Sequence, residues 1–328
     1  MKHLSFNEQQ PNAAASPPPA DYTQLARLGR TSRGSYLAGF SVIVASWLGL
    51  GLVATLLVAR LFPGALNPNG TSLGSYLVVN ASLLTLLAGV VVAVRLVHRR
   101  PVWSLITPTG RVDPRRLLRS VVVFAVLLAV SHVIWAVSHP SAYQLTLDLS
   151  RWLLLLPIVV AVTSLQVFAE ELFFRGYVLQ ALGLATRRRW LLVAVSAVEF
   201  AIPHVFNVAI GGHWVTGSLY YLMMGAFFAL VTLRDNRLEL AIGAHAANNL
   251  FVALLVNAGN SGMPTQAVWQ TRGDSSLYGL LATSVITAIF YTLLVKKPAV
   301  LVGPDSRERS NDAPTSTSER ACDHRGPR

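Results

Sequence analysis

The sequence carries little charge for its length and almost no cysteine. Only 13% of its 328 residues are Asp, Glu, Lys or Arg, against about 25% in an ordinary soluble domain. Hydrophobic residues make up 53% of the chain, and the mean hydropathy is +0.49. This composition excludes a typical cytosolic globule and favours a polytopic membrane protein. Cys322 is the one cysteine, which excludes an intramolecular disulfide and a cysteine-based zinc site.

Long apolar segments recur along the chain. A membrane-spanning helix needs about 20 mostly apolar residues. Eight segments of about this kind lie near 37–59, 73–94, 117–138, 152–182, 190–210, 215–233, 238–257 and 276–295. We therefore predict an all-α fold, a transmembrane helix bundle of about eight spans. No internal repeat is evident, so an inverted-repeat transporter gains no support from the sequence.

The basic residues are distributed unevenly between alternate loops. With the N-terminus inside, 23 of the 27 Lys and Arg fall on inner segments, and three, Arg60, Arg151 and Arg272, fall on outer ones. Loops rich in Lys and Arg stay on the cytoplasmic side of a membrane, so we expect both termini to be cytoplasmic. The same distribution accounts for the net charge of +12 without a nucleic-acid partner. Because the basic residues are mostly arginine, which hints at a GC-rich bacterium, we expect a bacterial plasma membrane.

Polar residues interrupt three of the predicted spans. An ionisable side chain at the centre of a membrane helix costs roughly 2.5–3.5 kcal/mol on insertion scales and usually faces the interior of the bundle. These residues are Glu170, Glu171 and Arg175 in the fourth span, Glu199 and His204 in the fifth, and His245, Asn248 and Asn249 in the seventh. We expect them to meet inside the bundle.

Their spacing suggests different roles. Glu171 and Arg175 are four residues apart and can form an ion pair on one helix face. Glu170 is rotated by about 100° from Glu171, which leaves it as the free carboxylate. His245 and Asn249 are also one helical turn apart, on a single face.

This set of side chains suits activation of a water molecule. A carboxylate and an imidazole can bind and deprotonate water, while a second imidazole and an amide donate to a developing oxyanion. The set Glu170, His204 and His245 could instead hold a divalent metal such as zinc, because one glutamate and two histidines are a known hydrolytic ligand set. The sequence has no HExxH, GxSxG or GxGD-type pattern, so serine and aspartyl mechanisms lack support.

Three motifs resemble those of the type II CAAX prenyl endopeptidases and their bacterial relatives, the CPBP (ABI) family of intramembrane proteases. The family's EExxxR is similar to residues 170–175, its FxxxH to residues 200–204, and its HxxxN to residues 245–249. Every fixed position matches, in the family's order and on three separate predicted spans. The resemblance covers about a third of the chain.

The resemblance implies roles for individual residues. Glu170 would match the general base, assisted by His204, and His245 with Asn249 would match the pair that stabilises the oxyanion. Glu171 and Arg175 would match the supporting ion pair. Asn248 is an alternative to Asn249. Glu199 lies outside the family pattern, and we expect a structural or tuning role for it. The family is called metalloprotease or glutamate protease, so the resemblance implies either a metal-dependent or a metal-free mechanism.

These observations predict the following organisation: a disordered polar and proline-rich cytoplasmic N-terminus over 1–35; spans one to three with a basic cytoplasmic loop over 36–149; the catalytic core over 150–257; an outer loop and the last span over 258–297; and a disordered cytoplasmic tail over 298–328. The first span is expected to serve as an uncleaved insertion signal.

We expect an intramembrane endopeptidase whose substrate is a peptide or a membrane-associated protein. One alternative is a non-catalytic membrane protein, of binding or bacteriocin-immunity type, that retains the polar pocket. A second is a transporter that uses the carboxylates as a proton relay.

Overall fold

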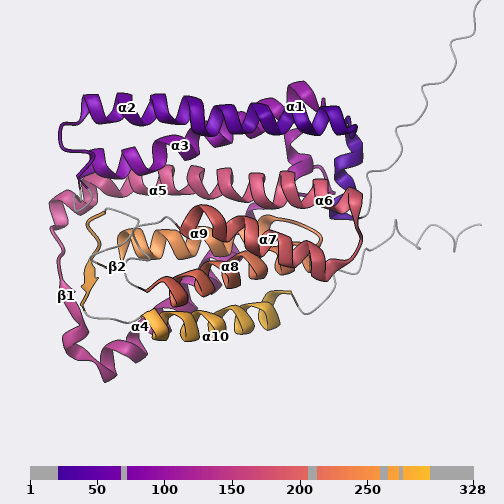
Figure 1. Ribbon diagram of the computed structural model, residues 1–328. Helices are drawn as coiled ribbons and strands as arrows, with labels where there is room; N and C mark the ends of the chain where they lie inside the picture. Colours follow the sequence, from indigo (N-terminus) through magenta and orange to yellow (C-terminus); the bar gives the residue numbers. More distant parts are fainter. Residues whose placement is uncertain (1–20, 68–71, 206–212, 259–264, 273–275, 296–328) are drawn as a thin grey trace, which may run out of the picture. The chain divides into compact units, whose positions relative to one another are not determined.

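The computed structural model describes residues 21–67, 72–205, 213–258, 265–272 and 276–295 (Figure 1). Its α-helices are α1 (Arg33–Val44), α2 (Gly51–Leu61), α3 (Leu73–Val92), α4 (Pro114–Ser138), α5 (Leu149–Glu171), α6 (Leu179–Ala185), α7 (Arg189–Val205), α8 (Trp214–Asp235), α9 (Glu239–Leu254) and α10 (Ser276–Leu294). Shorter helical segments are η1 (Tyr22–Leu28), η2 (Ala45–Leu50), η3 (Ala93–Val97), η4 (Val102–Leu105), η5 (Pro140–Ala142) and η6 (Leu172–Val178).

The prediction of a polytopic helix bundle is confirmed. Within the described residues, six helices are long and apolar enough to cross a membrane: Arg33–Leu61, Leu73–Val97, Pro114–Ser138, Leu149–Ala185, Trp214–Asp235 and Ser276–Leu294. They match six of the eight expected spans. The other two fall on α7, of which 17 residues are described, and on α9. Helix α9 has 16 residues, fewer than the roughly 20 that a full crossing requires.

Helix α9 lies at the centre of the bundle. Helices α2, α3 and α5 lie side by side, α9 follows α5, and α10 lies at the opposite edge against α4 and α8 (Figure 1). Twelve of the 16 residues of α9 are buried, whereas α4 exposes mainly valines along its length. A helix enclosed by protein on most sides can carry polar groups that lipid would exclude, and α9 carries His245 and Asn249.

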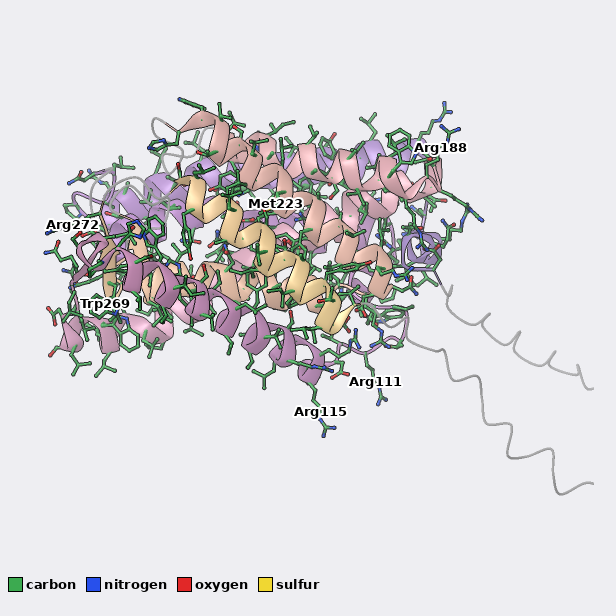
Figure 2. All side chains as sticks on the ribbon, turned by 90° about the horizontal axis from the view of Figure 1, so that it is seen from below. Arg111, Arg115, Arg188, Met223, Trp269 and Arg272 are labelled. Carbon is green, nitrogen blue, oxygen red and sulfur yellow. The ribbon has the colours of Figure 1, made fainter. Side chains whose placement is uncertain are left out.

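Arginines gather at one end of the bundle. Figure 2 shows Arg111, Arg115 and Arg188 at one end and Arg272 with Trp269 at the other. At the arginine-rich end, Asp113 caps α4 by accepting hydrogen bonds from the backbone N–H groups of Arg115 (2.9 Å) and Arg116 (3.4 Å). Arg116 also donates to the Asp235 carboxylate, which joins the start of α4 to the end of α8.

The expectation of disorder across residues 1–35 is wrong for the described part of that segment. Residues Tyr22–Leu28 form η1, in which Tyr22, Leu25 and Ala26 are buried. The hydroxyl of Tyr22 donates to the backbone carbonyl of Leu105. The prediction extended the polar, proline-rich character of the first twenty residues to the short apolar pattern that follows them. These twenty residues lie outside the described part of the chain, as does the predicted tail over 298–328.

A small β-sheet caps the other end of the bundle. The strands β1 (Tyr143–Leu145), β2 (Val256–Ala258) and β3 (Trp269–Thr271) lie in the order β1-β3-β2, with β1 antiparallel and β2 parallel to β3. Gln270 is opposite Gln144 on one side and Asn257 on the other. Three-residue strands have no periodicity that a sequence pattern can reveal, and the sequence analysis did not predict them.

Close packing of α7 on α8 depends on Gly225. A Cβ atom at this position would meet Ala197 Cα at 2.9 Å and Phe200 Cβ at 3.0 Å. We predict that Gly225→Val lowers the free energy of unfolding by about 1–3 kcal/mol, because overpacking forces the helices apart. The measurement is the thermal unfolding midpoint in detergent. Gly279→Val is the control, since a Cβ at Gly279 meets nothing within 4 Å; equal midpoints for the two variants would contradict this account.

Candidate active site

The fourth-span motif lies where the helix changes its winding. Helix α5 ends at Glu171 and continues without a break into η6, a seven-residue π-helix. Such segments are rare and occur frequently at functional sites. The change occurs between Glu171 and Arg175. The expectation that residues four apart lie on one face, which holds for a regular α-helix, is therefore only approximate here. Both side chains point into the bundle, and both are fully buried.

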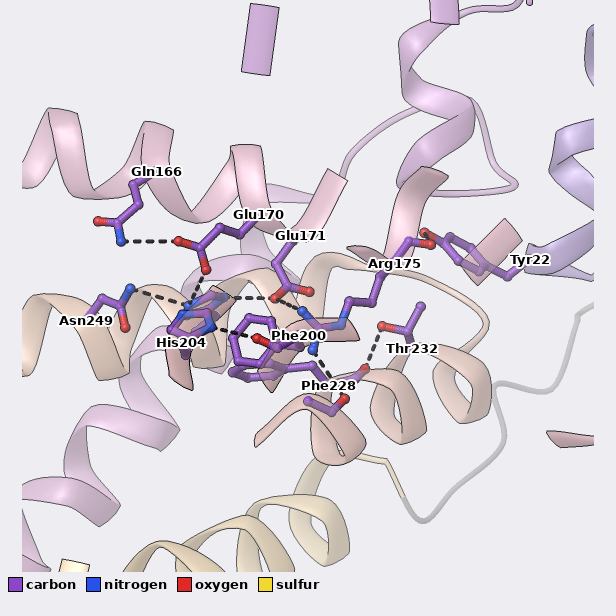
Figure 3. A network of polar contacts seen from close by, with 12 residues as sticks. Tyr22, Gln166, Glu170, Glu171, Arg175, Phe200, His204, Phe228, Thr232 and Asn249 are labelled. Carbon is purple, nitrogen blue, oxygen red and sulfur yellow. Dashed lines mark hydrogen bonds and ion pairs between the residues drawn. The ribbon is translucent and has the colours of Figure 1, made fainter. Parts of the chain in front are cut away.

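The predicted ion pair between Glu171 and Arg175 is present. Arg175 Nη1 donates to Glu171 Oε1 at 2.9 Å, and Arg175 Nη2 donates to the backbone carbonyl of Gly225 at 3.2 Å. The same Glu171 oxygen accepts a hydrogen bond of 2.8 Å from Nδ1 of His245. Glu171 therefore joins α5 to α9 directly and to α8 through the arginine (Figure 3). The sequence predicted the first partner of Glu171 but not the second.

Glu170 keeps one oxygen free of hydrogen bonds. Its Oε1 accepts from Gln166 Nε2 at 3.2 Å. Its Oε2 is buried without a hydrogen-bond donor among the described residues, and it lies 3.7 Å from His245 Nε2. Gln166 is one turn before Glu170 on α5 and was not among the candidates, because a glutamine in an apolar helix belongs to no motif.

His204 presents one ring nitrogen to the site. Its Nδ1 lies 2.6 Å from the backbone carbonyl of Phe200, which can only accept, so Nδ1 carries the proton in this tautomer. Nε2 is therefore the basic nitrogen when the ring is neutral. His204 lies within electrostatic range of Glu170 and His245. The described part of α7 ends one residue later, at Val205.

Phe200 fills the space between the charged groups. Its ring centroid is 4.6 Å from that of His204 and 5.8 Å from that of His245. The guanidinium carbon of Arg175 lies 4.4 Å from the same ring, a distance typical of a cation–π contact. The FxxxH aromatic thus packs against both imidazoles and the arginine.

The seventh-span motif forms a chain of hydrogen bonds. Asn249 Nδ2 lies 3.3 Å from His245 Nε2, and Asn248 Nδ2 donates to Asn249 Oδ1 at 3.2 Å. The hydroxyl of Tyr220 donates to Asn248 Oδ1 at 3.1 Å. Asn249 contacts the histidine directly, whereas Asn248 contacts it only through Asn249. This geometry favours Asn249 over Asn248 as the motif asparagine.

Two adjacent tyrosines of α8 complete the arrangement. Tyr220 binds Asn248, as described above, and the ring of Tyr221 stacks on His204 with centroids 4.3 Å apart. Neither tyrosine was predicted, because aromatic residues are common in membrane helices and carry no spacing signal by themselves.

Glu199 takes no part in the hydrogen bonds described above. Its Oε1 is buried without a hydrogen-bond partner among the described residues, as is the hydroxyl of Ser196 one turn earlier. Its carboxylate lies within electrostatic range of Arg175. The structural or tuning role expected for Glu199 stays a prediction.

The metal site expected at Glu170, His204 and His245 stays a prediction. Within the described part of the chain, no three His, Cys, Asp or Glu side chains form a group that could hold a metal ion. Nδ1 of His245 is engaged by Glu171, and its Nε2 lies beside the amide of Asn249. The expected set of Glu170, His204 and His245 therefore gains no support from the geometry.

The buried ion pair gives a testable prediction. Arg175→Met leaves the Glu171 carboxylate buried without its cation, and we expect a loss of about 3–5 kcal/mol in the free energy of unfolding. The double variant Glu171→Gln/Arg175→Met removes the charge as well and should recover part of this loss. Unfolding midpoints in detergent measure both. Arg188→Met, at an exposed position, is the control; a loss no larger than that of Arg188→Met would contradict the role of the pair.

Comparison with known proteins gives two matches. Residues 150–251 match the family model described as type II CAAX prenyl endopeptidase Rce1-like. The chain is also 31% identical over 260 residues to the uncharacterized protein YyaK of Bacillus subtilis (strain 168), covering 75% of this chain and 86% of that protein. No solved structure matches the chain. The family match spans all three motifs, from α5 to α9.

Proposed function

The chain belongs to the type II CAAX prenyl endopeptidase Rce1-like family, and from this membership we propose that it is an intramembrane endopeptidase in which Glu170 and His204 activate water. Membership implies peptidase activity in general, and the six apolar helices make the chain an integral membrane protein. The observation that carries the finer proposal is the free oxygen of Glu170, which is buried and faces His245.

Glu170 acts as the general base. A carboxylate oxygen without a donor can accept a proton from water, and the basic Nε2 of His204 holds the same water in the site. Gln166 fixes the other oxygen of Glu170, so the carboxylate is oriented by a side chain of its own helix. The water oxygen then attacks the carbonyl carbon of the peptide bond, and its proton passes to Glu170.

Asn249 and His245 stabilise the oxyanion. The two nitrogens lie 3.3 Å apart, so one oxygen can accept hydrogen bonds from both. His245 lies between two carboxylates, Glu171 at 2.8 Å and Glu170 at 3.7 Å; in this role its Nε2 carries a proton and donates to the oxyanion. Removing one donor of this type typically costs 10²–10³ in turnover.

Release of the products returns the site to its starting state. When the carbon–nitrogen bond breaks, the proton held by Glu170 passes to the leaving nitrogen, which departs as an amine. The other product carries the new carboxyl group, which contains the oxygen of the attacking water. Atoms and charge balance with water as the only co-reactant.

We place the enzyme in a bacterial plasma membrane with the arginine-rich end of the bundle in the cytoplasm. The uneven distribution of Lys and Arg supports this orientation, and the Bacillus subtilis relative is in keeping with a bacterial source. The substrate is a peptide or a membrane-associated protein that reaches the buried carboxylate from within or beside the bilayer.

The first test of the proposal replaces the base. We predict that Glu170→Gln lowers peptide cleavage at least roughly a thousandfold, because an amide cannot accept the proton of water at neutral pH. Purified protein in nanodiscs is incubated with a library of membrane-anchored peptides, and new termini are identified by mass spectrometry. Glu199→Gln is the matched control, a half-buried glutamate of α7, and should retain most of the activity. Full activity in Glu170→Gln would contradict the role of Glu170 as the base, and no activity in the wild type across the library would contradict the proposal and favour a non-catalytic binding protein.

The second test concerns the metal. Since no group of three ligands is arranged in the described residues, we predict that cleavage survives prolonged incubation with a chelator. The measurement is the initial rate before and after chelation, with and without added zinc. Activity lost to chelation and restored by zinc would show that Glu170, His204 and His245 rearrange into a metal site.

A further inference from the structure

Arg100 is an almost fully buried arginine outside the candidate active site. Its residue is 3% exposed, and it follows η3 at the arginine-rich end of the bundle. The preceding residue, Arg99, has a φ of 53°, a left-handed conformation that is uncommon for a residue other than glycine. This turn leaves Arg99 exposed and directs the next side chain into the protein.

The guanidinium of Arg100 is only partly satisfied. Its Nη1 donates to Gln180 Oε1 at 2.7 Å. Gln180 Nε2 in turn donates to the backbone carbonyl of Ser104 at 2.8 Å. The Nε and Nη2 atoms are buried and have no hydrogen-bond partner among the described residues. Two donor nitrogens of a permanently charged group therefore have no hydrogen-bond acceptor among the described residues.

No carboxylate compensates this charge in the described surroundings. Burial lowers the pKa of Arg100 from its ordinary value, and the ionisable groups within electrostatic range of it are Tyr36, Tyr22 and Tyr177. Burying a charge without a partner is costly, and in proteins such charges are normally paired. An anion bound at Nε and Nη2 would remove this cost.

A second unpaired donor belongs to the same cluster. The hydroxyl of Tyr36 is buried without a hydrogen-bond partner in the described residues. The Tyr36 ring packs on His98, with centroids 4.6 Å apart, and on Tyr177, with centroids 5.7 Å apart. His98 Nε2 and Tyr177 Oη form a hydrogen bond of 2.9 Å with each other. Neither of these two atoms therefore pairs with the Tyr36 hydroxyl.

We propose that Arg100 and Tyr36 form a binding site for a phosphate group, taken from the headgroup of an anionic phospholipid or from free phosphate. Arginine presents several N–H donors in a planar fork that matches phosphate oxygens. Tyr36 is the fourth residue of the membrane-spanning helix that begins at Arg33, a depth at which lipid headgroups lie. Exposed arginines nearby, among them Arg30 and Arg33, attract anions to this end of the bundle.

The test uses the full chain in nanodiscs of phosphatidylcholine with and without phosphatidylglycerol, and in phosphatidylcholine with added inorganic phosphate. Native mass spectrometry counts retained phosphatidylglycerol, and thermal unfolding reports binding of either ligand. We expect the wild type to gain stability from at least one ligand, and Arg100→Gln to bind it roughly tenfold more weakly or worse. The arm that stabilises the protein identifies the source of the phosphate group.

The matched control is Arg95→Gln, which removes an equal charge from an exposed position and should bind as the wild type does. If Arg100→Gln fails to fold, Tyr36→Phe decides the matter: it removes a single oxygen and should weaken binding several-fold. Equal binding by Arg100→Gln and Arg95→Gln, equal binding by Tyr36→Phe and the wild type, or no stabilisation by either ligand would overturn the proposal.

Discussion

The buried carboxylate of Glu171 is the interaction on which the rest of the site depends. It accepts from Arg175 and from His245 through the same oxygen, and Arg175 reaches on to the backbone of α8. Three helices are thus joined by one ion pair and its hydrogen bonds, all shielded from solvent. Two donors, one of them a permanent cation, offset the cost of burying the carboxylate. Its bond to Nδ1 also turns the other nitrogen of His245 toward Glu170.

The bundle supplies the environment that makes these interactions strong. Helix α9 is too short to cross a membrane on its own, yet it needs no lipid-facing surface, because α4, α5 and α8 enclose it. Aromatic rings of Phe200 and Phe228 cover the histidine and the arginine. In such a low-dielectric interior, hydrogen bonds and charges act more strongly than they do in water. The same enclosure leaves the free oxygen of Glu170 without competing donors.

Much of this arrangement could be predicted from the sequence, for physical reasons. Apolar runs long enough to span a bilayer predict helices, and the six longest are confirmed by the described structure. A glutamate and an arginine four residues apart in such a run must pair, as Glu171 and Arg175 do. The motifs also identified the three helices that meet at the site.

Other features could not be predicted, because they depend on tertiary contacts. The bond from His245 to Glu171 joins residues 74 positions apart, and no spacing rule connects them. Tyr220 and Tyr221 contribute through the side of α8 that faces α7 and α9, which the composition of the helix does not reveal. The π-helical turn after Glu171, the buried segment η1 and the three-residue strands are likewise too short or too irregular to leave a periodic signal.

The most direct test of the central claim, hydrolysis by a water activated at Glu170, is a single-turnover cleavage in water enriched in oxygen-18. The account predicts that the new carboxyl group of the product carries one labelled oxygen and that Glu170 carries none, because the attacking atom comes straight from water. Label in the Glu170 side chain would instead indicate a covalent acyl intermediate. That result would contradict the role of Glu170 as a base.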